Sequence, residues 1–445
     1  MKKTIPAFFA VVLLASFISS CKQKQPLSID ITKLQHQCVQ RLTDVIVYDI
    51  FTPPVAGRIY AYSNLAYYEA LRFNEAKASS IAAKLKGFDA IPQPEKNKIY
   101  DYTLAAVKSF FNVARALTFS KDSLTITETG LLKSFKNATE ESVYKNSLAL
   151  GDSIAAVILK RAAVDNYKKT RGMPRYSVFK ETGKWQQTPP DYADAVEPNW
   201  SLIEPLLLDS AAQFKPAPPP SFDLDKNSQY YKELMEVFTI SKQITPLQDT
   251  IARYWDDNPF VTEHTGHLMF ANKKTTPGGH WMGIISILCQ QTKADDIKTA
   301  SAYAYTSCAI FDGFISCWDE KYRSSMVRPI TVIRENIAPE WNSLLQTPPF
   351  PEYTSGHSVI TAAASAVLSQ LFGDAVAFHD TTELEYLGLE RSFISIQAAA
   401  DEAGISRLYG GIHYRSAISE GKKQGQQVGQ FYNNIFNLSK QPALP

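Results

Sequence analysis

The sequence predicts an all-α protein built from two helical halves, and three observations lead to this prediction. Apolar residues recur at spacings of three and four along most of the chain, which places them on one face of a helix. No intervening segment alternates apolar and polar residues as a half-buried strand does. A proline-rich stretch from Tyr176 to Asp225 interrupts the helical pattern near the middle of the chain.

Length and charge set the outer limits of the fold. At 445 residues the chain exceeds what one hydrophobic core usually serves, so we expect two domains. The proline stretch gives an N-terminal helical domain over residues 29–220, which includes this crossover, and a C-terminal helical bundle over residues 221–445. The formal net charge of +2 gives no general attraction to nucleic acid, so we expect no nucleic-acid partner and only local basic sites.

The first 21 residues resemble a bacterial lipoprotein signal peptide. A basic pair at residues 2–3 precedes an apolar run over residues 5–18, and two serines stand directly before Cys21. In a lipoprotein, Cys21 is acylated and becomes the mature N-terminus, with residues 22–28 as a polar tether. The pattern predicts a protein held in the cell envelope by a lipid anchor, and the lack of an acidic residue after the cysteine favours the outer membrane. A plain signal peptide is the alternative.

Helical periodicity defines the elements in order along the chain. We expect helices over Val39 to Ile50, Ile59 to Leu71, Asn97 to Leu117, Ser142 to Ala163, Tyr230 to Ile240, Ala294 to Ser325, Ser358 to Leu371, Thr382 to Ala400 and Ser416 to Ile435. A Pro-Pro pair at 53–54 separates the first two. The last carries Gly421, Gly425 and Gly429, a smooth stripe that lets a neighbouring helix approach closely.

Four cysteines remain after Cys21, namely Cys38, Cys289, Cys308 and Cys317. They form no C-x-x-C pair and have no spacing typical of metal ligands. We therefore expect them in the hydrophobic core, while the sequence leaves open whether any two form a disulfide.

Three segments of the C-terminal half place basic or hydrogen-bonding side chains beside predicted helix ends. In the first, six residues separate Lys321 from Arg328, and Pro329 is expected to stop the helix so that the arginine lies where the chain turns. Taken alone, a lysine and an arginine at a helix end usually only complement the helix dipole.

The second segment is Ser355-Gly356-His357, which follows several prolines and leads into an alanine-rich helix. Ser355 is placed as an N-cap, and Gly356 lets backbone N–H groups approach an anion without a side chain in the way. His357 would then lie within reach of a proton on a leaving group. In isolation, a capped helix with a structural histidine is the simpler interpretation.

The third segment runs from Ser406 to Arg415. Arg407 offers a bidentate guanidinium for two oxygens of a phosphate-like ion. His413 follows a Gly-Gly bend and could present a neutral ring nitrogen to the central atom of such an ion. A single histidine in such a loop is more often structural than catalytic.

Together the three segments, K-x(6)-R-P, S-G-H and S-R-x(5)-H, resemble the signature of the type 2 phosphatidic acid phosphatase and vanadium haloperoxidase superfamily. Further segments, spread over most of the mature chain, resemble the haloperoxidase branch: Pro53 to Tyr62, Gly183 to Pro190, Glu197 to Pro220 and Ile251 to Trp255. The segment Pro349-Phe350-Pro351 is similar to the chloroperoxidase pattern, with Phe350 where bromoperoxidases tend to carry histidine.

The resemblance implies vanadate as the cofactor, with His413 as the vanadium ligand and His357 as the residue that assists proton transfer. The groups implied to bind the vanadate oxygens are Lys321, Arg328, Arg407, Ser355 and the N–H of Gly356. The implied reaction is the oxidation of halide by hydrogen peroxide. The alternative is an acid phosphatase in which His413 attacks a phosphoester and His357 protonates the leaving group. A non-catalytic oxyanion-binding lipoprotein is a third hypothesis.

Two positions depart from the family pattern. Thr354 stands where proline is common, which should only loosen the turn. Ala417 stands where relatives place an aspartate that orients the apical histidine, and Glu420 on the same helical face is the candidate substitute. Weak orientation of His413 would harm attack on phosphorus more than vanadate coordination, which favours the peroxidase, although the missing aspartate is also what favours the binding protein.

The remaining histidines suggest no further site. His264 and His267, with Glu263 and His280 nearby, lack the one-turn helical spacing of a zinc motif, so we do not predict a metal site there. We expect His36 and His379 to be surface or capping residues.

Overall fold

The computed structural model describes residues 27, 29–178, 180–259, 261–265, 268–271 and 273–438. Within them the α-helices are α1 (Ile31–Tyr48), α2 (Pro53–Leu71), α3 (Tyr102–Leu117), α4 (Lys121–Ala138), α5 (Glu141–Ala163), α6 (Tyr167–Arg171), α7 (Gln229–Lys242), α8 (Pro246–Tyr254), α9 (Pro277–Thr292), α10 (Asp296–Ser324), α11 (Pro329–Asn336), α12 (Gly356–Phe372), α13 (Leu384–Leu387), α14 (Ile396–Tyr409) and α15 (Arg415–Phe436). Short 3-10 helices are η2 (Arg72–Asn74), η3 (Ala82–Lys84) and η4 (Trp200–Leu202). The predicted all-α class is confirmed.

Two small antiparallel hairpins are the strands of the described residues. β1 (Thr262–Thr265) pairs with β2 (Leu268–Ala271), with Thr262 opposite Ala271. β3 (Phe378–Asp380) pairs with β4 (Arg391–Phe393), with Phe378 opposite Phe393. Each strand has only three or four residues, too few for a recognisable alternating pattern.

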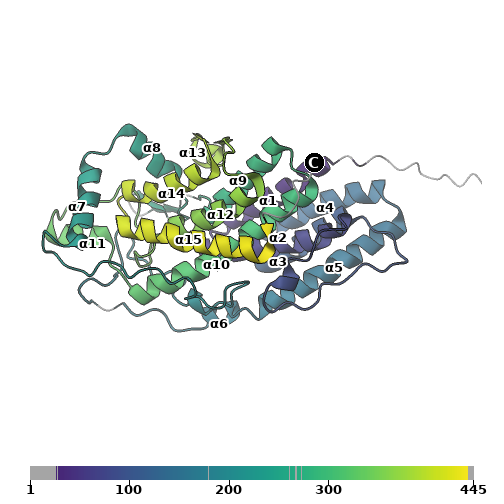
Figure 1. The fold of residues 1–445 in the computed structure, drawn as a ribbon, viewed down its shortest axis with the longest axis horizontal. Helices are drawn as coiled ribbons and strands as arrows, with labels where there is room; N and C mark the ends of the chain where they lie inside the picture. Colours follow the sequence, from purple (N-terminus) through teal and green to yellow (C-terminus); the bar gives the residue numbers. More distant parts are fainter. Residues whose placement is uncertain are drawn as a thin grey trace, which may run out of the picture.

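The helices of the two halves share one apolar core. The long helix α10 packs on α2 from the N-terminal half and on α12 from the C-terminal half, and α15 packs on both α12 and α10 (Figure 1). The largest cluster of buried apolar side chains includes residues as far apart in sequence as Leu34 and Leu438. The four cysteines Cys38, Cys289, Cys308 and Cys317 are buried and unpaired, as expected of core residues. The division near residue 220 stays a prediction.

The glycines of α15 face α12 directly. A Cβ built on Gly425 would lie 2.1 Å from the carbonyl oxygen of Val359, and one built on Gly429 would lie 2.6 Å from Cβ of Ala366. Only glycine permits an approach this close. The interpretation of the stripe as a packing surface is confirmed.

Two predicted helix boundaries are wrong. The segment 382–400 is not one helix, because α13 ends at Gly388 in the left-handed region (φ +66°) and β4 follows before α14 begins. Pro329 does not stop the preceding helix: α10 ends at Ser324, with Ser325 in the left-handed region, and Pro329 is the first residue of α11. Proline suits this position because the first N–H of a helix has no partner within the helix.

Two predictions about the membrane fall outside what the structure describes. Cys21 and all of the tether over residues 22–28 except Leu27 lie outside the described residues. Within the described part of the chain, no helix is both long and apolar enough to cross a membrane.

Candidate oxyanion site

The three sequence segments meet at the ends of four helices. Lys321 lies in the last turn of α10, Arg328 directly precedes α11, His357 lies in the first turn of α12, Arg407 lies in the last turn of α14, and His413 lies in the loop between α14 and α15. A cavity of about 30 Å³ has Gly356, His357, Arg407 and His413 in its wall. Phe314, Trp318 and Phe350 form an aromatic side of the same cavity.

Arg328 is fully buried and only partly satisfied. Its Nε donates to the carbonyl oxygen of Phe350 (2.9 Å), and its Nη1 donates to that of Ile412 (2.8 Å). Nη1 also lies 3.3 Å from Nε2 of His413. Nη2 has no hydrogen-bond partner within the described residues. A buried guanidinium with a free N–H group is costly unless an acceptor completes its hydrogen bonds.

Arg407 is likewise buried and only partly satisfied. It is 1% exposed; its Nη1 donates to the carbonyl oxygen of Trp255 (2.7 Å), and its Nη2 lies 3.9 Å from Oδ1 of Asp256. Its Nε has no partner within the described residues. Two buried guanidinium groups with unused donors fit an anion with several oxygens.

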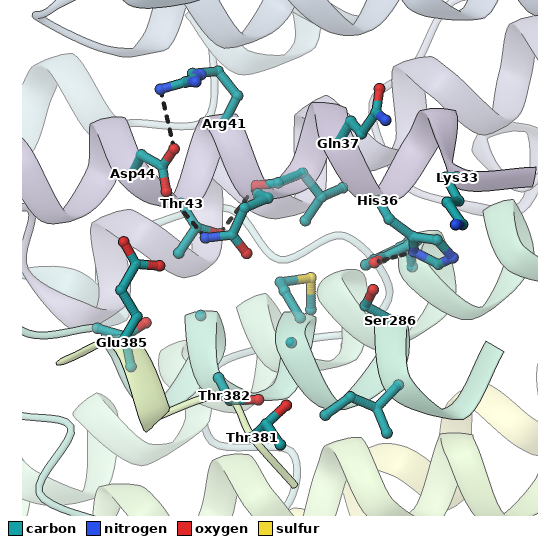
Figure 2. Close-up of a pocket in the computed structure, with 18 of the residues that line it drawn as sticks. Lys33, His36, Gln37, Arg41, Thr43, Asp44, Ser286, Thr381, Thr382 and Glu385 are labelled. Carbon is teal, nitrogen blue, oxygen red and sulfur yellow. Dashed lines mark hydrogen bonds and ion pairs between the residues drawn. The ribbon is translucent and has the colours of Figure 1, made fainter. Parts of the chain in front are cut away.

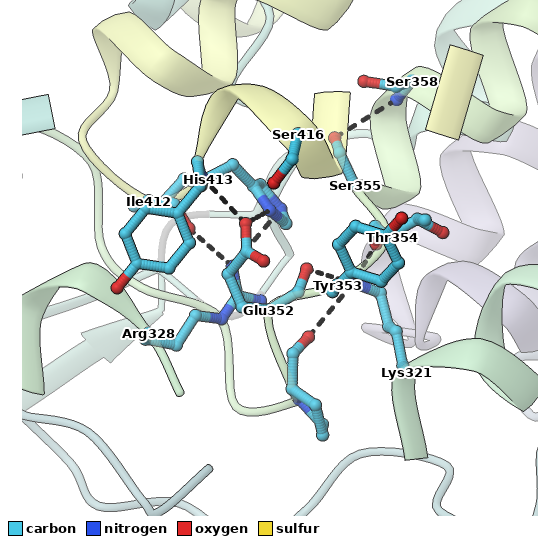
Figure 3. A network of polar contacts seen from close by, with 12 residues as sticks. Lys321, Arg328, Glu352, Tyr353, Thr354, Ser355, Ser358, Ile412, His413 and Ser416 are labelled. Carbon is cyan, nitrogen blue, oxygen red and sulfur yellow. Dashed lines mark hydrogen bonds and ion pairs between the residues drawn. The ribbon is translucent and has the colours of Figure 1, made fainter. Parts of the chain in front are cut away.

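Lys321 is also buried, but its donors are already engaged. Nζ donates to the carbonyl oxygens of Pro351 (3.1 Å), Glu352 (3.1 Å) and Thr354 (2.5 Å), as Figure 3 shows. An ammonium group has three donors, so Lys321 holds the loop before α12 and contributes charge to the site without a free N–H. Burial lowers the pKa of Lys321 to about 7.

His413 is oriented by Glu352. Its Nδ1 lies 2.8 Å from Oε1 of Glu352, and the same oxygen accepts the backbone N–H of Tyr414 (2.9 Å), as Figure 3 shows. Arg328 faces Nε2 with a group that can only donate, so Nε2 carries the lone pair and Nδ1 carries the proton. Burial, reinforced by Arg328, lowers the pKa of His413 well below its usual value. Its ring is therefore a neutral ligand or nucleophile with Nε2 toward the site.

The prediction that Glu420 orients His413 is wrong. Glu420 forms an ion pair with Lys423 (2.5 Å), one turn along the same helix. The orienting carboxyl group comes instead from Glu352, whose pKa burial raises to about 8. The sequence signal for Glu352 was its position, three residues before Ser355 and directly after the prolines that precede the Ser-Gly-His motif.

Ser355 and Gly356 start α12 as predicted. The hydroxyl oxygen of Ser355 accepts the backbone N–H of Ser358 (3.4 Å), which confirms the N-cap. A Cβ on Gly356 would lie 3.7 Å from the ring of Trp318, so a side chain there would point toward the aromatic side of the cavity.

His357 lines the cavity and is the nearest candidate for proton transfer. Its Nε2 lies 3.5 Å from Oδ2 of Asp257 and has no hydrogen bond within the described residues. Burial, together with the charge of Arg407, lowers the pKa of His357 to about 4, so the ring is neutral at pH 7 and can accept a proton. We did not predict Asp257; the acidic pair at 256–257, directly after the segment Ile251 to Trp255, was the available signal.

A larger cleft lies elsewhere, between α1, α9 and the segment around Thr382 (Figure 2). Its volume is about 680 Å³, and none of the predicted site residues lines it. His36 stands at its edge, and our expectation that this residue is at the surface is wrong: it is 8% exposed, with Nδ1 2.8 Å from the hydroxyl of Tyr303. The side chains of His264 and His267 lie outside the described residues.

Comparison with known proteins finds one family model and several solved structures that this chain resembles. Residues 301–439 match the family model described as the VCPO second helical-bundle domain. The fold is similar to a structure described as the first bacterial vanadium-dependent iodoperoxidase, with a TM-score of 0.88 and 45% identity, covering 93% of this chain and 98% of that one. No curated protein matches the sequence.

More distant structures have the same fold. A bacterial vanadium-dependent chloroperoxidase in its holo form superposes with a TM-score of 0.67 at 17% identity, covering 88% of this chain and 94% of that one. The apo form gives the same TM-score and identity and covers 96% of that chain.

Proposed function

The chain belongs to the vanadium-dependent haloperoxidases, which are oxidoreductases that use hydrogen peroxide and halide, and on this premise we propose that it oxidises iodide at a vanadate held by the oxyanion site. The observation that carries the assignment of the site is a set of buried side chains with unused hydrogen-bonding atoms. Nε of Arg407 and Nε2 of His357, two residues of the cavity wall, have no hydrogen bond within the described residues, and Nε2 of His413, a third, carries a lone pair. Nη2 of Arg328 has no hydrogen bond there either, and Nη1 of the same side chain lies 3.3 Å from Nε2 of His413.

These groups fit vanadate in charge and in chemistry. The free N–H groups of Arg328 and Arg407 would donate to vanadate oxygens, as would the backbone N–H of Gly356, while Lys321 adds positive charge. Nε2 of His413 is the nitrogen that would coordinate the metal, because Glu352 holds the proton on the other ring nitrogen. Bound vanadate would supply a Lewis-acidic centre that activates hydrogen peroxide toward halide.

His357 is the residue that would move protons. Its neutral ring can take a proton from hydrogen peroxide, and Asp257, whose Oδ2 lies 3.5 Å from Nε2, stabilises the resulting imidazolium. The two arginines do not compete for this role, because a guanidinium stays protonated.

The aromatic side of the cavity supports iodide as the preferred halide. Phe314 and Phe350 have no hydrogen-bond donor in their side chains, and the indole N–H of Trp318 already donates to the carbonyl oxygen of Val196 (3.2 Å), so this side offers little to a small, strongly hydrated anion such as chloride. Iodide is the most weakly hydrated and most easily oxidised of the three common halides. The similar structure described as an iodoperoxidase supports the same choice.

A parallel assay tests this proposal. The purified protein is stripped of vanadium, titrated with vanadate, and given hydrogen peroxide with iodide, bromide or chloride, while p-nitrophenyl phosphate hydrolysis is measured on the vanadate-free protein. We expect vanadate-dependent iodide oxidation with a kcat/KM above that for bromide, and negligible oxidation of chloride. Equal turnover of all three halides would contradict the assignment of iodide.

Phosphate-ester hydrolysis is the second candidate, because the contact between Glu352 and His413 would also orient a nucleophile. Because Glu352 holds His413, weak orientation of this histidine does not favour the peroxidase over the phosphatase. For the same reason, the missing aspartate at position 417 does not favour a non-catalytic protein. Hydrolysis of p-nitrophenyl phosphate that disappears in His413→Ala and is inhibited by vanadate would establish this second activity.

We also propose that the protein is a lipoprotein of the cell envelope, anchored through Cys21. The basic pair, apolar run and serines before Cys21 support it. Metabolic labelling with a palmitate analogue tests it: the wild-type chain should be labelled and sediment with membranes. Cys21→Ala should lose the label, and labelling that persists in this variant would contradict the anchor.

A further inference from the structure

A second buried cluster of titratable groups lies beside the oxyanion site. Asp257 follows α8, His280 lies in the first turn of α9, Asp380 ends β3, and Glu383 precedes α13. None of the four is more than 2% exposed. Three carboxyl groups around one imidazole are costly to bury unless their negative charge is compensated.

We propose that Asp257, His280 and Glu383 bind a divalent first-row transition-metal ion, and that Asp380 holds the imidazole from outside the coordination shell. Nδ1 of His280 lies 3.0 Å from Oδ1 of Asp257 and 3.5 Å from Oε1 of Glu383, and one ligand atom from each residue lies within 4.8 Å of the others. Ligands bound at about 2.0–2.2 Å from one ion stand about 3–3.5 Å from their nearest neighbours.

The other side of the imidazole has the partner that a metal-binding histidine usually has. Nε2 lies 3.0 Å from Oδ2 of Asp380, whose Oδ1 accepts the backbone N–H of Thr382 (3.0 Å). Metal-binding histidines commonly donate their second ring N–H to a carboxylate, which fixes the tautomer and the ring orientation. Without an ion, Nδ1 is hydrogen-bonded to Oδ1 of Asp257 at 3.0 Å, and an ion bound at Nδ1 would replace the proton of that contact.

Glu383 supplies an independent indication of a missing partner. Its Oε1 is buried, faces Nδ1 of His280, and has no hydrogen bond within the described residues, although buried polar atoms nearly always have one. Lys274 does not supply the missing partner, because its ammonium group is engaged with Oδ2 of Asp256 at 2.7 Å.

The donor set indicates the class of ion. One imidazole nitrogen with carboxylate oxygens suits zinc or manganese, whereas calcium is usually bound by oxygens alone. The indole of Trp255 stacks on the His280 ring at 4.4 Å between centroids and closes one face of the site. The ion would join the loop after α8, helix α9 and the segment before α13 at one point.

Isothermal titration calorimetry tests the proposal on the full mature chain, treated with chelator and free of vanadate. The probes are ZnCl2, MnCl2 and CaCl2, and thermal unfolding is followed in parallel. We expect one zinc or manganese ion per chain, bound at least ten times more tightly than calcium, and a higher Tm with the ion present. Because neither vanadate nor turnover is involved, the result is independent of the proposed function.

Matched variants identify the ligands. His280→Gln and Glu383→Gln should each weaken zinc binding at least tenfold, and Asp380→Asn should weaken it about 10- to 100-fold. The controls His379→Gln and Glu385→Gln change the same residue types at exposed positions nearby and should bind like the wild type. Circular dichroism verifies that each variant is folded. Absence of zinc and manganese binding by the wild-type chain, or equal binding by folded Glu383→Gln, would overturn the proposal.

Discussion

Oε1 of Glu352 lies 2.8 Å from Nδ1 of His413, and this contact determines which ring nitrogen faces the oxyanion site. The same oxygen accepts the backbone N–H of Tyr414, so its direction is fixed by the start of α15 as well. The carboxyl group comes from the loop before α12 that Lys321 holds through three carbonyl oxygens. The loop before α12 therefore positions both Ser355, the N-cap of α12, and His413.

Removing this contact should weaken vanadate binding more than it destabilises the fold. Glu352→Ala leaves Nδ1 of His413 without an acceptor, so we expect about a 10- to 100-fold loss in vanadate affinity, measured by titrating the vanadium-free enzyme. Glu352→Gln keeps an acceptor oxygen and should recover most of the affinity. Glu420→Ala is the control and should leave affinity unchanged, since the ion pair of that residue in the described structure is with Lys423, on the same helix.

The free guanidinium donor of Arg407 should matter more than its charge. Arg407→Lys keeps the positive charge but removes the guanidinium group. In the wild type, Nη1 of this group donates to the carbonyl oxygen of Trp255 and its Nε is unused. We expect kcat/KM for iodide to fall about 100- to 1,000-fold, the usual cost of losing one preorganised donor to a charged centre. The comparison is Arg323→Lys, which changes a half-exposed ion pair with Asp319 at the end of α10. This variant should have little effect on kcat/KM.

The sequence allowed several of the helices to be predicted, because the spacing of apolar residues is a local pattern. The spacing of apolar residues located α3, α5, α7, α10, α12 and α15 within a few residues. Asp257 and Glu352 were missed because no local pattern encodes their contacts. Asp257 contacts His357, 100 positions along the chain, and Glu352 contacts His413, 61 positions along.

The broken segment over residues 382–400 has a different cause. Its apolar spacing is compatible with a helix, but Gly388 adopts a left-handed conformation and the following residues pair as β4 with β3. Tertiary pairing therefore overrides helical propensity at this point. The burial of His36 also depends on tertiary structure, because its partner Tyr303 is distant in the sequence and lies 2.8 Å away only in the folded chain.

Buried neutral histidines should make the protein less stable as the pH falls. Burial lowers the pKa of His36 to about 4, whereas in the unfolded chain it titrates near about 6.5. Between these values the unfolded state binds the proton and the native state does not, so the free energy of unfolding decreases from about pH 6.5 to pH 4. Denaturant unfolding at pH 7 and pH 5 measures this. In His36→Gln the decrease should be smaller by about 1–2 kcal/mol; an unchanged decrease would show that His36 does not contribute.

Two glycine-to-alanine substitutions, one where α15 contacts α12 and one on α4, should have opposite effects on the free energy of unfolding. In Gly425→Ala the new Cβ would lie 2.1 Å from the carbonyl oxygen of Val359, so the helices must separate where Ser355 and His357 begin α12. We expect a loss of about 1–3 kcal/mol in the free energy of unfolding, together with weaker vanadate binding. In Gly130→Ala the Cβ meets nothing within 4 Å on α4, so alanine should stabilise the helix by about 0.5–1 kcal/mol and leave vanadate binding unchanged. Equal effects of the two substitutions on thermal unfolding would mean that the close approach of α15 does not limit the packing of α12.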